Sequence, residues 1–186
     1  MILDLAKSKE KEIVDLRRTL HMHPEIAHKE FETQKILLER LERLDAEIRK
    51  VAGTGIEALI RGKGKGKTVA LRADMDALPI NEENDVEYRS KNPGFMHACG
   101  HDTHMSMVYG AGLVFNEIKE KINGNIKLIF QPAEEEGTLG GAKPMIEEGV
   151  LNNVDYILGM HVWPELPEGT VGYRSGPFFA AADNII

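Results

Sequence analysis

The stretch Thr68-Val-Ala-Leu-Arg-Ala-Asp-Met-Asp-Ala-Leu-Pro79 passes from a short apolar run into an acidic segment that Pro79 closes. Such a run is typical of a buried strand, and we expect it to be a central strand of a sheet. Asp74 and Asp76 are two positions apart, so in extended backbone they project to one side as the chain leaves the strand. An acidic turn explains this pattern without any function, but the end of a strand is also where open α/β sheets place their sites.

Short runs of branched apolar residues occur on both sides of this strand, and segments with helical spacing separate them. The expected strands are 46–51, 55–61, 68–73, 125–130 and 156–162, and the expected helices are 9–22, 31–44, 103–122 and 141–148. The glycine- and lysine-rich segment 61–67 is predicted to be a solvated hairpin turn between its two flanking strands. The alternation predicts an α/β domain in which helices flank both faces of a mixed, twisted sheet.

Length and composition exclude several classes of protein. The chain has 186 residues, 42% of them hydrophobic, and a net charge of −7, which is enough for one globular core and argues against nucleic acid as a partner. No apolar stretch approaches the ~18 residues of a membrane span, and Asp4 interrupts the N-terminus too early for a secretory signal. The single cysteine, Cys99, can form no internal disulfide. We therefore expect a cytoplasmic protein that does not bind membranes.

The motif His97-Ala-Cys-Gly-His-Asp-Thr-His104 carries the clearest chemical signal. Cys99 and His101 are two positions apart, and thiolate with imidazole is the ligand set of zinc and other borderline divalent metals. The structural alternative is a small buried hydrophobe beside a helix whose N-cap is Asp102 or Thr103. One cysteine and three histidines within eight residues favour the metal site.

Two further strand ends carry ligand-type residues. Phe130-Gln-Pro-Ala-Glu-Glu-Glu-Gly137 places three carboxylates after an apolar strand, and His161 lies near the end of another. A solvated acidic loop and a hydrogen-bonded core histidine are the ordinary explanations of each feature taken alone. However, a hydrolytic metal site needs one carboxylate to hold the ion and a second, uncoordinated one to accept a proton from water. Adjacent glutamates can divide these tasks.

These motifs together resemble the amidohydrolase branch of the co-catalytic metallopeptidases related to aminoacylase and carboxypeptidase. That branch includes hippurate hydrolases, N-acyl-L-amino-acid amidohydrolases and the plant indole-acetyl-amino-acid hydrolases. The matching pieces, in the family's order and spacing, are Arg17-Arg-Thr-Leu-His-Met-His-Pro-Glu25, Leu71-Arg-Ala-Asp-Met-Asp-Ala-Leu-Pro79, Met96-His-Ala-Cys-Gly-His-Asp-Thr-His104, Ile129-Phe-Gln-Pro-Ala-Glu-Glu135, Gly140-Gly-Ala142 and Gly159-Met-His-Val162.

The resemblance implies a role for each matched residue. The implied metal ligands are Cys99, His101, Glu135 and His161, and the implied general base is Glu134. Glu136 is then a neighbour without a role, an assignment that rests on aligning Pro132-Ala133 with the family motif. Asp74, Asp76 and Asp102 are expected to lie behind the ligands without coordinating. The expected cofactor is one or two divalent ions, with zinc, manganese, cobalt and nickel all compatible with the mixed ligand set.

The resemblance also implies a zinc-exopeptidase-like catalytic domain that hydrolyses the amide bond of N-acyl amino acids or short peptides. A carboxypeptidase or aminoacylase of the same family, and an inactive metal-binding fragment, are the alternatives. Family members are roughly twice as long, with an inserted lid domain that mediates dimerisation and a further histidine ligand in the returning catalytic segment. We therefore expect residues 1–186 to be the N-terminal part of the catalytic domain of a protein that forms homodimers or higher oligomers. The unclosed apolar run at 181–186 fits this expectation.

Overall fold

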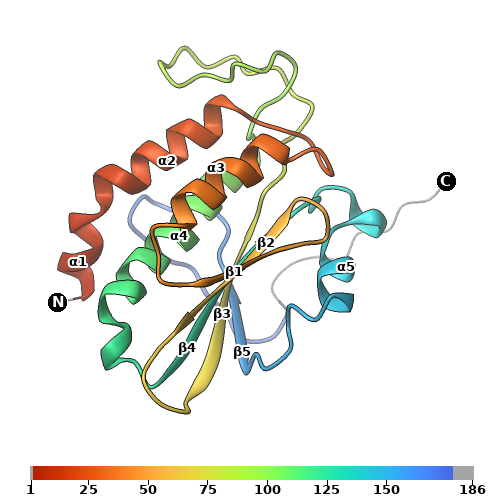
Figure 1. Cartoon of the computed structure of the whole chain (residues 1–186). Helices are drawn as coiled ribbons and strands as arrows, with labels where there is room; N and C mark the ends of the chain where they lie inside the picture. The colour runs from red at the N-terminus through yellow and green to blue at the C-terminus, as the bar shows by residue number, and fades with distance from the viewer. Residues whose placement is uncertain (1, 178–186) are drawn as a thin grey trace.

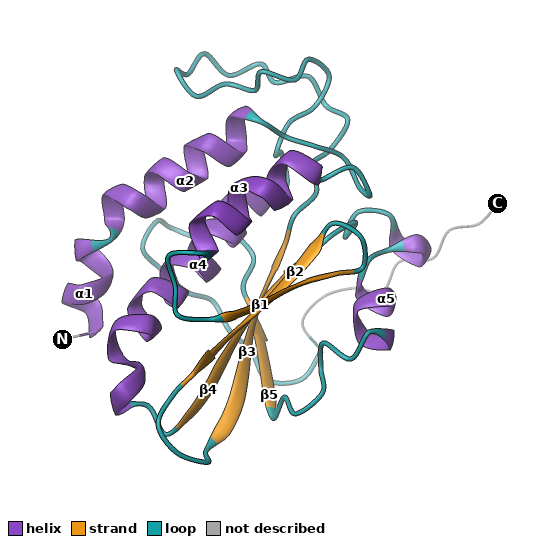
Figure 2. Ribbon diagram, in the orientation of Figure 1, coloured by secondary structure: helices purple, strands orange, loops and turns teal. Residues whose placement is uncertain are grey.

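A computed structural model describes residues 2–177 and shows one five-stranded mixed sheet flanked by helices (Figure 2). The strands are β1 (Glu47–Val51), β2 (Gly55–Arg61), β3 (Lys67–Asp74), β4 (Gly124–Gln131) and β5 (Tyr156–Gly159). Their order in the sheet is β1-β2-β4-β3-β5. The apolar run at 181–186 lies outside the described residues.

The sheet divides into an antiparallel part and a parallel part. β1 pairs with β2 and β2 with β4 in antiparallel fashion, whereas β3 pairs in parallel with both β4 and β5. β4 is the central strand, and β3, which we expected to be central, lies beside it with a neighbour on each side. Since β3, β4 and β5 are parallel, their carboxyl ends meet at one edge of the sheet, and the ligand-type residues follow all three.

The predicted hairpin between β2 and β3 is wrong, because β4 lies between these two strands. The glycine-rich link instead crosses the start of β4: Gly62 N donates to Gly124 O at 3.0 Å, and Lys63 N donates to Ile122 O at 2.8 Å. A Cβ on Gly66 would lie 2.0 Å from the backbone oxygen of Asn123. The glycines therefore permit a close crossing of backbones and do not form a tight hairpin turn.

Replacing Gly66 with alanine is expected to destabilise the fold by about 1–3 kcal/mol, because the added methyl group meets backbone atoms that cannot move aside. Denaturant unfolding of the two proteins measures the difference. Gly159→Ala is the matched control. Its new Cβ would lie 3.8 Å from the backbone oxygen of Arg72, which is an ordinary van der Waals contact. Equal stability of the Gly66→Ala variant and the parent would contradict the crossing as described.

Helices cover both faces of the sheet, as predicted (Figure 1). The larger layer contains α1 (Ile2–Ser8), α2 (Glu10–Met22), α3 (Phe31–Leu41) and α4 (His101–Ile118), and α5 (Ala142–Glu147) covers the other face. The larger core packs α2, α3 and α4 on the sheet, with residues such as Leu20, Leu37, Tyr109, Leu128 and Phe130. The smaller core is made by Val51, Ala70, Ile129, Met145 and Val150. Helix α1 and the 3₁₀ turn Gly137–Leu139 were not predicted, and the predicted helix 103–122 is α4 followed by a 3₁₀ turn at Lys119–Lys121.

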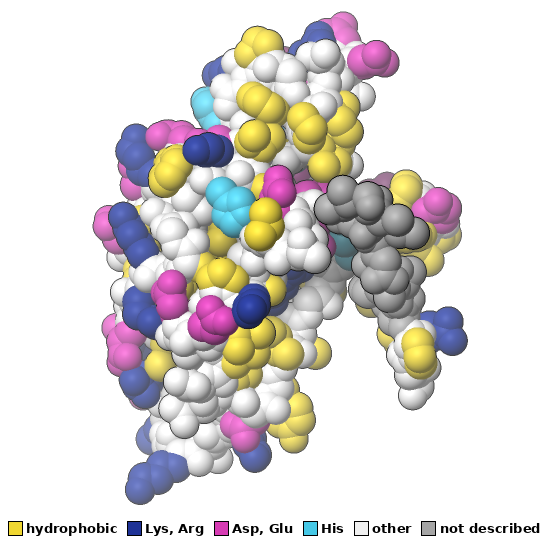
Figure 3. Space-filling model, turned by 90° about the vertical axis from the view of Figure 1, so that its right-hand side faces the viewer, with side chains coloured by type: hydrophobic (Ala, Val, Ile, Leu, Met, Phe, Trp, Pro, Cys, Tyr) yellow, Lys and Arg dark blue, Asp and Glu magenta, His cyan; other side chains and the backbone are white. Residues whose placement is uncertain are grey.

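None of the helices in residues 2–177 is long and apolar enough to cross a membrane. On the face seen in Figure 3, acidic and basic side chains are interspersed among apolar ones.

Candidate metal centre

Ligand-type side chains gather at the carboxyl edge of the parallel strands. β3 ends at Asp74, and Asp76 lies just beyond it. The residues Glu134 and Glu135 come after β4, and His161 comes after β5. Strand β5 is shorter than the predicted 156–162, so His161 lies two residues beyond its end and not within it. Three groups of side chains have potential ligand atoms within 4.8 Å of one another: Cys99, His101 and His161; His101, Glu134 and Glu135; and Asp74, His101 and His104.

His101 belongs to all three groups and is fully buried. Its Nε2 lies 3.7 Å from Glu135 Oε1 and 3.8 Å from Glu134 Oε2, and neither ring nitrogen has a hydrogen-bond partner. Burial alone disfavours a charged ring, but the neighbouring Asp76, Cys99 and Asp74 together raise the pKa of His101 to about 11. A buried imidazole whose ring nitrogens make no hydrogen bond, and whose Nδ1 lies 3.5 Å from Asp76 Oδ1, fits a divalent cation, which would displace the ring proton and balance the negative charge of the carboxylates.

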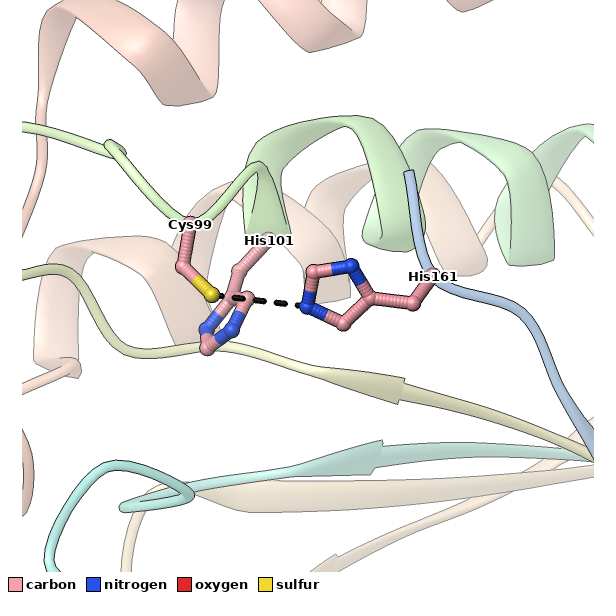
Figure 4. Close-up of side chains that lie close together, drawn as sticks. All are labelled: Cys99, His101 and His161. Carbon is pink, nitrogen blue, oxygen red and sulfur yellow. Dashed lines mark hydrogen bonds between the residues drawn. The ribbon is translucent and has the colours of Figure 1, made fainter. Parts of the chain in front are cut away.

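Cys99 and His161 approach His101 from different segments (Figure 4). Cys99 comes from the loop before α4 and His161 from the segment after β5, and their Sγ and Nε2 atoms are 3.4 Å apart. The Nδ1 atom of His161 lies 2.6 Å from Val162 O, which leaves Nε2 as the nitrogen that faces the cysteine. One sulfur, two imidazoles and adjacent carboxylates make a donor set that fits one or two borderline divalent cations.

Asp76 holds the backbone that carries the two glutamates. Its two carboxylate oxygens accept the N–H groups of Glu134 and Glu135, each at 2.9 Å. The Glu134 side chain is 40% exposed, so a substrate can reach it, and burial together with the charge of Asp74 raises its pKa. Glu136 belongs to none of the three ligand groups found among the described residues.

His104 received no individual role from the sequence, but it connects two parts of the site. Its Nδ1 lies 2.7 Å from Asp74 Oδ1, and its Nε2 accepts the Val162 N–H at 3.0 Å, so Nδ1 carries the proton and donates to Asp74. Burial opposes ionisation of Asp74, yet the hydrogen bond from His104 and the charges of His101 and Arg72 hold the pKa of this carboxyl well below its usual range. The spacing of His101 and His104, three residues apart on a helix, is the sequence signal that places both on one face.

The start of α4 differs from the N-caps, Asp102 or Thr103, that the structural alternative to a metal site named. The helix begins at His101, and Gly100 precedes it with a φ of 86°, a left-handed conformation that favours glycine. Asp102 therefore lies inside the first turn, where its carboxylate accepts the Thr103 N–H at 2.9 Å. A Cβ on Gly100 would lie 2.4 Å from Val162, so the missing side chain also admits the segment that carries His161.

Asp102 is the centre of a separate buried cluster that ties α2 to α4 and to the irregular loop 79–100. Its Oδ2 lies 2.9 Å from Arg17 Nε and 2.7 Å from His21 Nδ1, and His21 Nε2 lies 3.1 Å from Glu82 Oε1. The matched motif at 17–25 thus supplies Arg17 and His21 as partners of Asp102. This cluster holds the backbone from which His101 projects.

We expect His21 to stabilise the fold more at low pH than at high pH. The pKa of His21 is raised mainly by its hydrogen bond to Asp102 and also by Glu82, whereas burial and Arg17 lower it. The ring of Tyr88 packs edge-on against the His21 ring. A raised folded-state pKa gives stability that is complete below the unfolded pKa of 6.5 and is lost as the pH rises through the folded pKa. The unfolding free energy of the parent minus that of His21→Gln should therefore be larger at about pH 5.5 than at about pH 9. A difference that is independent of pH would contradict the protonated bridge.

His97 differs from the other histidines of the motif. It is 3% exposed, both its ring nitrogens lack a hydrogen-bond partner, and burial lowers its pKa to about 4. Its ring is therefore neutral near pH 7. It belongs to none of the three ligand groups found in the part of the chain that the structure describes.

Comparison with known proteins assigns this geometry to a family. Residues 70–179, more than half of the chain, match the model of peptidase family M20/M25/M40. The chain belongs to this family. Within it, the chain is 51% identical to thermostable carboxypeptidase 2 of Saccharolobus solfataricus over 173 residues, which are 92% of this chain and 44% of the relative. It is 44% identical to an N-acetyl-L-cysteine deacetylase of Bacillus subtilis over 175 residues, 94% of this chain and 42% of that protein.

Solved structures agree with this M20/M25/M40 membership. The YXEP protein of Bacillus subtilis, described as a dinuclear metal-binding peptidase of the M20 family, superposes with a TM-score of 0.87 at 43% identity, over 92% of this chain and 48% of that one. The fold predicted from the sequence and the resemblance to metal-dependent amidohydrolases are thereby confirmed. The chain spans less than half the length of these relatives.

Proposed function

We propose that this chain carries the metal-binding part of a hydrolase that cleaves the amide bond of N-acyl amino acids or short peptides. The observation that carries the proposal is the buried imidazole of His101, whose ring nitrogens make no hydrogen bond, between a thiol, a second imidazole and two adjacent glutamates. The names of relatives support the substrate class, because they include an N-acyl-L-amino acid amidohydrolase of Geobacillus stearothermophilus and an IAA-amino acid hydrolase of Arabidopsis thaliana.

Four residues would hold the metal: Cys99, His101, Glu135 and His161. One or two divalent ions fit this set, and the thiolate favours zinc, cobalt or nickel, while the carboxylate also admits manganese. When bound there, such an ion supplies a Lewis acid that polarises the scissile carbonyl and makes a nearby water more acidic.

Glu134 is then the general base. It lies next to Glu135 on the same loop and is reachable from solvent, so one glutamate can hold the ion while the other accepts the proton of the attacking water. The same carboxyl returns the proton to the leaving nitrogen when the amide bond breaks. Asp76 supports this division by fixing the backbone of both glutamates.

A carboxypeptidase activity is the second candidate, favoured by the 51% identity to a thermostable carboxypeptidase. Both candidates break an amide bond beside an amino acid with a free carboxylate, and they differ in what lies on the acyl side. N-acetyl-methionine and hippurate test the first, and N-blocked dipeptides test the second. A higher kcat/KM for the dipeptides than for N-acetyl-methionine and hippurate would favour a carboxypeptidase over an amidohydrolase.

The chain covers only 44% of the length of the carboxypeptidase relative, so the proposal also concerns the rest of the protein. We propose that residues 1–186 are the N-terminal part of the catalytic domain, and that the whole protein adds a lid domain through which it forms a homodimer or a higher oligomer. The molecular mass of the full-length protein in solution tests this. A full-length monomer would contradict it.

Metal content and hydrolysis measured together test the proposed function. The purified chain is analysed for bound metal and assayed on N-acetyl-methionine and hippurate with added manganese, cobalt or zinc, and the full-length protein is treated in parallel. We expect metal in both and turnover at least in the full-length protein. Metal in the chain without turnover in either protein would leave a metal-binding fragment and contradict the hydrolase.

A further inference from the structure

The loop that carries Glu134 and Glu135 is held through three consecutive backbone amides. Ala133 N donates to Glu30 Oε1 at 2.8 Å, and the next two amides donate to Asp76. Both acceptors are buried carboxylates. Ala133 itself is fully buried and has a φ of +51°, a conformation that an alanine rarely adopts. The chain thus makes a strained bend immediately before the two glutamates.

Glu30 does not serve the helix that it precedes. Helix α3 begins at Phe31, and the Glu30 side chain makes no capping hydrogen bond. The carboxylate of Glu25 does this instead, since it accepts the N–H of Thr33 at 2.8 Å and the N–H of Glu32 at 3.2 Å. The start of α3 is satisfied without the Glu30 carboxylate, so its burial needs another reason.

The Glu30 carboxylate is fixed from its other side by the turn between β1 and β2. Thr54 Oγ1 donates to Glu30 Oε2 at 2.6 Å, and Thr54 is only 3% exposed. One turn further along α3, Gln34 Nε2 donates to the carbonyl oxygens of Gly53 and Gly55, at 3.1 and 3.2 Å. The first turn of α3 and the β1–β2 turn therefore form one rigid support beneath Ala133.

We propose that Glu30 is a positioning residue for the two glutamates of the metal centre. By accepting the Ala133 amide it keeps the left-handed bend, and the bend sets the direction in which Glu134 and Glu135 leave the strand β4. Without this acceptor the buried amide has no partner, and the loop relaxes to a conformation that exposes or re-pairs it. Glu30 acts only through Ala133. This inference rests on the proposed function only in treating Glu134 and Glu135 as important for the reaction. The effect of Glu30 on the conformation of the loop does not depend on that function.

Hydrogen exchange at single amides tests the conformational step without any metal. In the metal-free chain, Glu30→Met keeps the length of the side chain but removes the acceptor. We expect protection of the Ala133, Glu134 and Glu135 amides to fall about tenfold or more, the equivalent of one lost charged hydrogen bond. Thr54→Val is the matched control, because it removes the other partner of Glu30 but keeps the acceptor of the Ala133 amide, so protection should fall less than in Glu30→Met. Unchanged protection at Glu134 and Glu135 in Glu30→Met would overturn the proposal.

Rescue and cobalt binding test the consequence for the site. Glu30→Gln retains one acceptor for Ala133 and gains a donor for the Thr54 hydroxyl, so we expect parental protection and a parental visible spectrum of bound Co²⁺. Glu30→Met should bind Co²⁺ about tenfold more weakly, with an altered spectrum. If it fails to fold, Glu30→Asp, which is too short to reach both partners, takes its place and must show the same losses. A parent that binds no Co²⁺ counts against the proposed function alone, because the exchange result still decides the role of Glu30.

Discussion

Replacing Glu134 with glutamine is expected to lower kcat by about 10²–10⁴-fold in the full-length protein, the usual contribution of a general base. Glutamine has nearly the same shape but cannot accept a proton, and the backbone bond from Glu134 N to Asp76 does not depend on the side chain. The ligand set assigned to Cys99, His101, Glu135 and His161 is intact. The metal content should therefore stay near that of the parent, and elemental analysis alongside the kinetics measures both quantities.

Glu136→Gln is the matched control for this experiment. It is the same substitution two residues further along the same loop, at a carboxylate that lies outside the ligand groups of the described residues. We expect its kcat and metal content to equal those of the parent. Loss of metal and turnover together in Glu134→Gln would mean that Glu134 is a ligand and that base and ligand are assigned the wrong way round.

Replacing His101 with alanine is expected to abolish metal binding, a larger effect than removal of any other single ligand. All three groups of potential ligands share this residue. Without it, Cys99 and His161 lose the imidazole that completes their group, and Glu134 and Glu135 lose the imidazole that completes theirs. Titration with Zn²⁺ followed by calorimetry measures the loss.

His28→Asn controls for the removal of a histidine elsewhere. His28 has a φ of 62°, and asparagine tolerates this conformation better than most residues, so the fold should be unaffected. His28→Asn should bind Zn²⁺ like the parent. Parental Zn²⁺ affinity in His101→Ala would show that the metal, if any, binds somewhere else.

The sequence predicted the elements of the fold better than their order. Short apolar runs identified the strands, and each of the five predicted strands is present, although β1 and β5 are mostly exposed. The insertion of β4 between β2 and β3 was not visible, since a glycine-rich link between two apolar runs is typical of a hairpin. Here the glycines instead serve the crossing of two backbones, at Gly66 and Asn123, and that contact exists only after β4 has paired.

In the site, too, residues marked by a local sequence motif were predicted, and a residue that acts through a distant contact was missed. Cys99, His101 and the glutamates stood out because their residue types and spacing are chemically unusual. The geometry also brings Glu134 and Glu135 to His101, while their individual roles stay predictions. Glu30 was missed because its partner is 103 residues away and because a glutamate just before a helix appears ordinary. No local pattern reports such a contact.

The most direct test of the metal centre is a titration of the purified chain with Co²⁺, followed in the ultraviolet and visible spectrum and compared with Cys99→Ala. We expect the chain to bind at least one equivalent tightly and to show a thiolate-to-cobalt charge-transfer band. In Cys99→Ala that band should be absent and the affinity lower. Binding that is identical in the two proteins, or no binding in the parent, would contradict a metal centre built on Cys99 and His101.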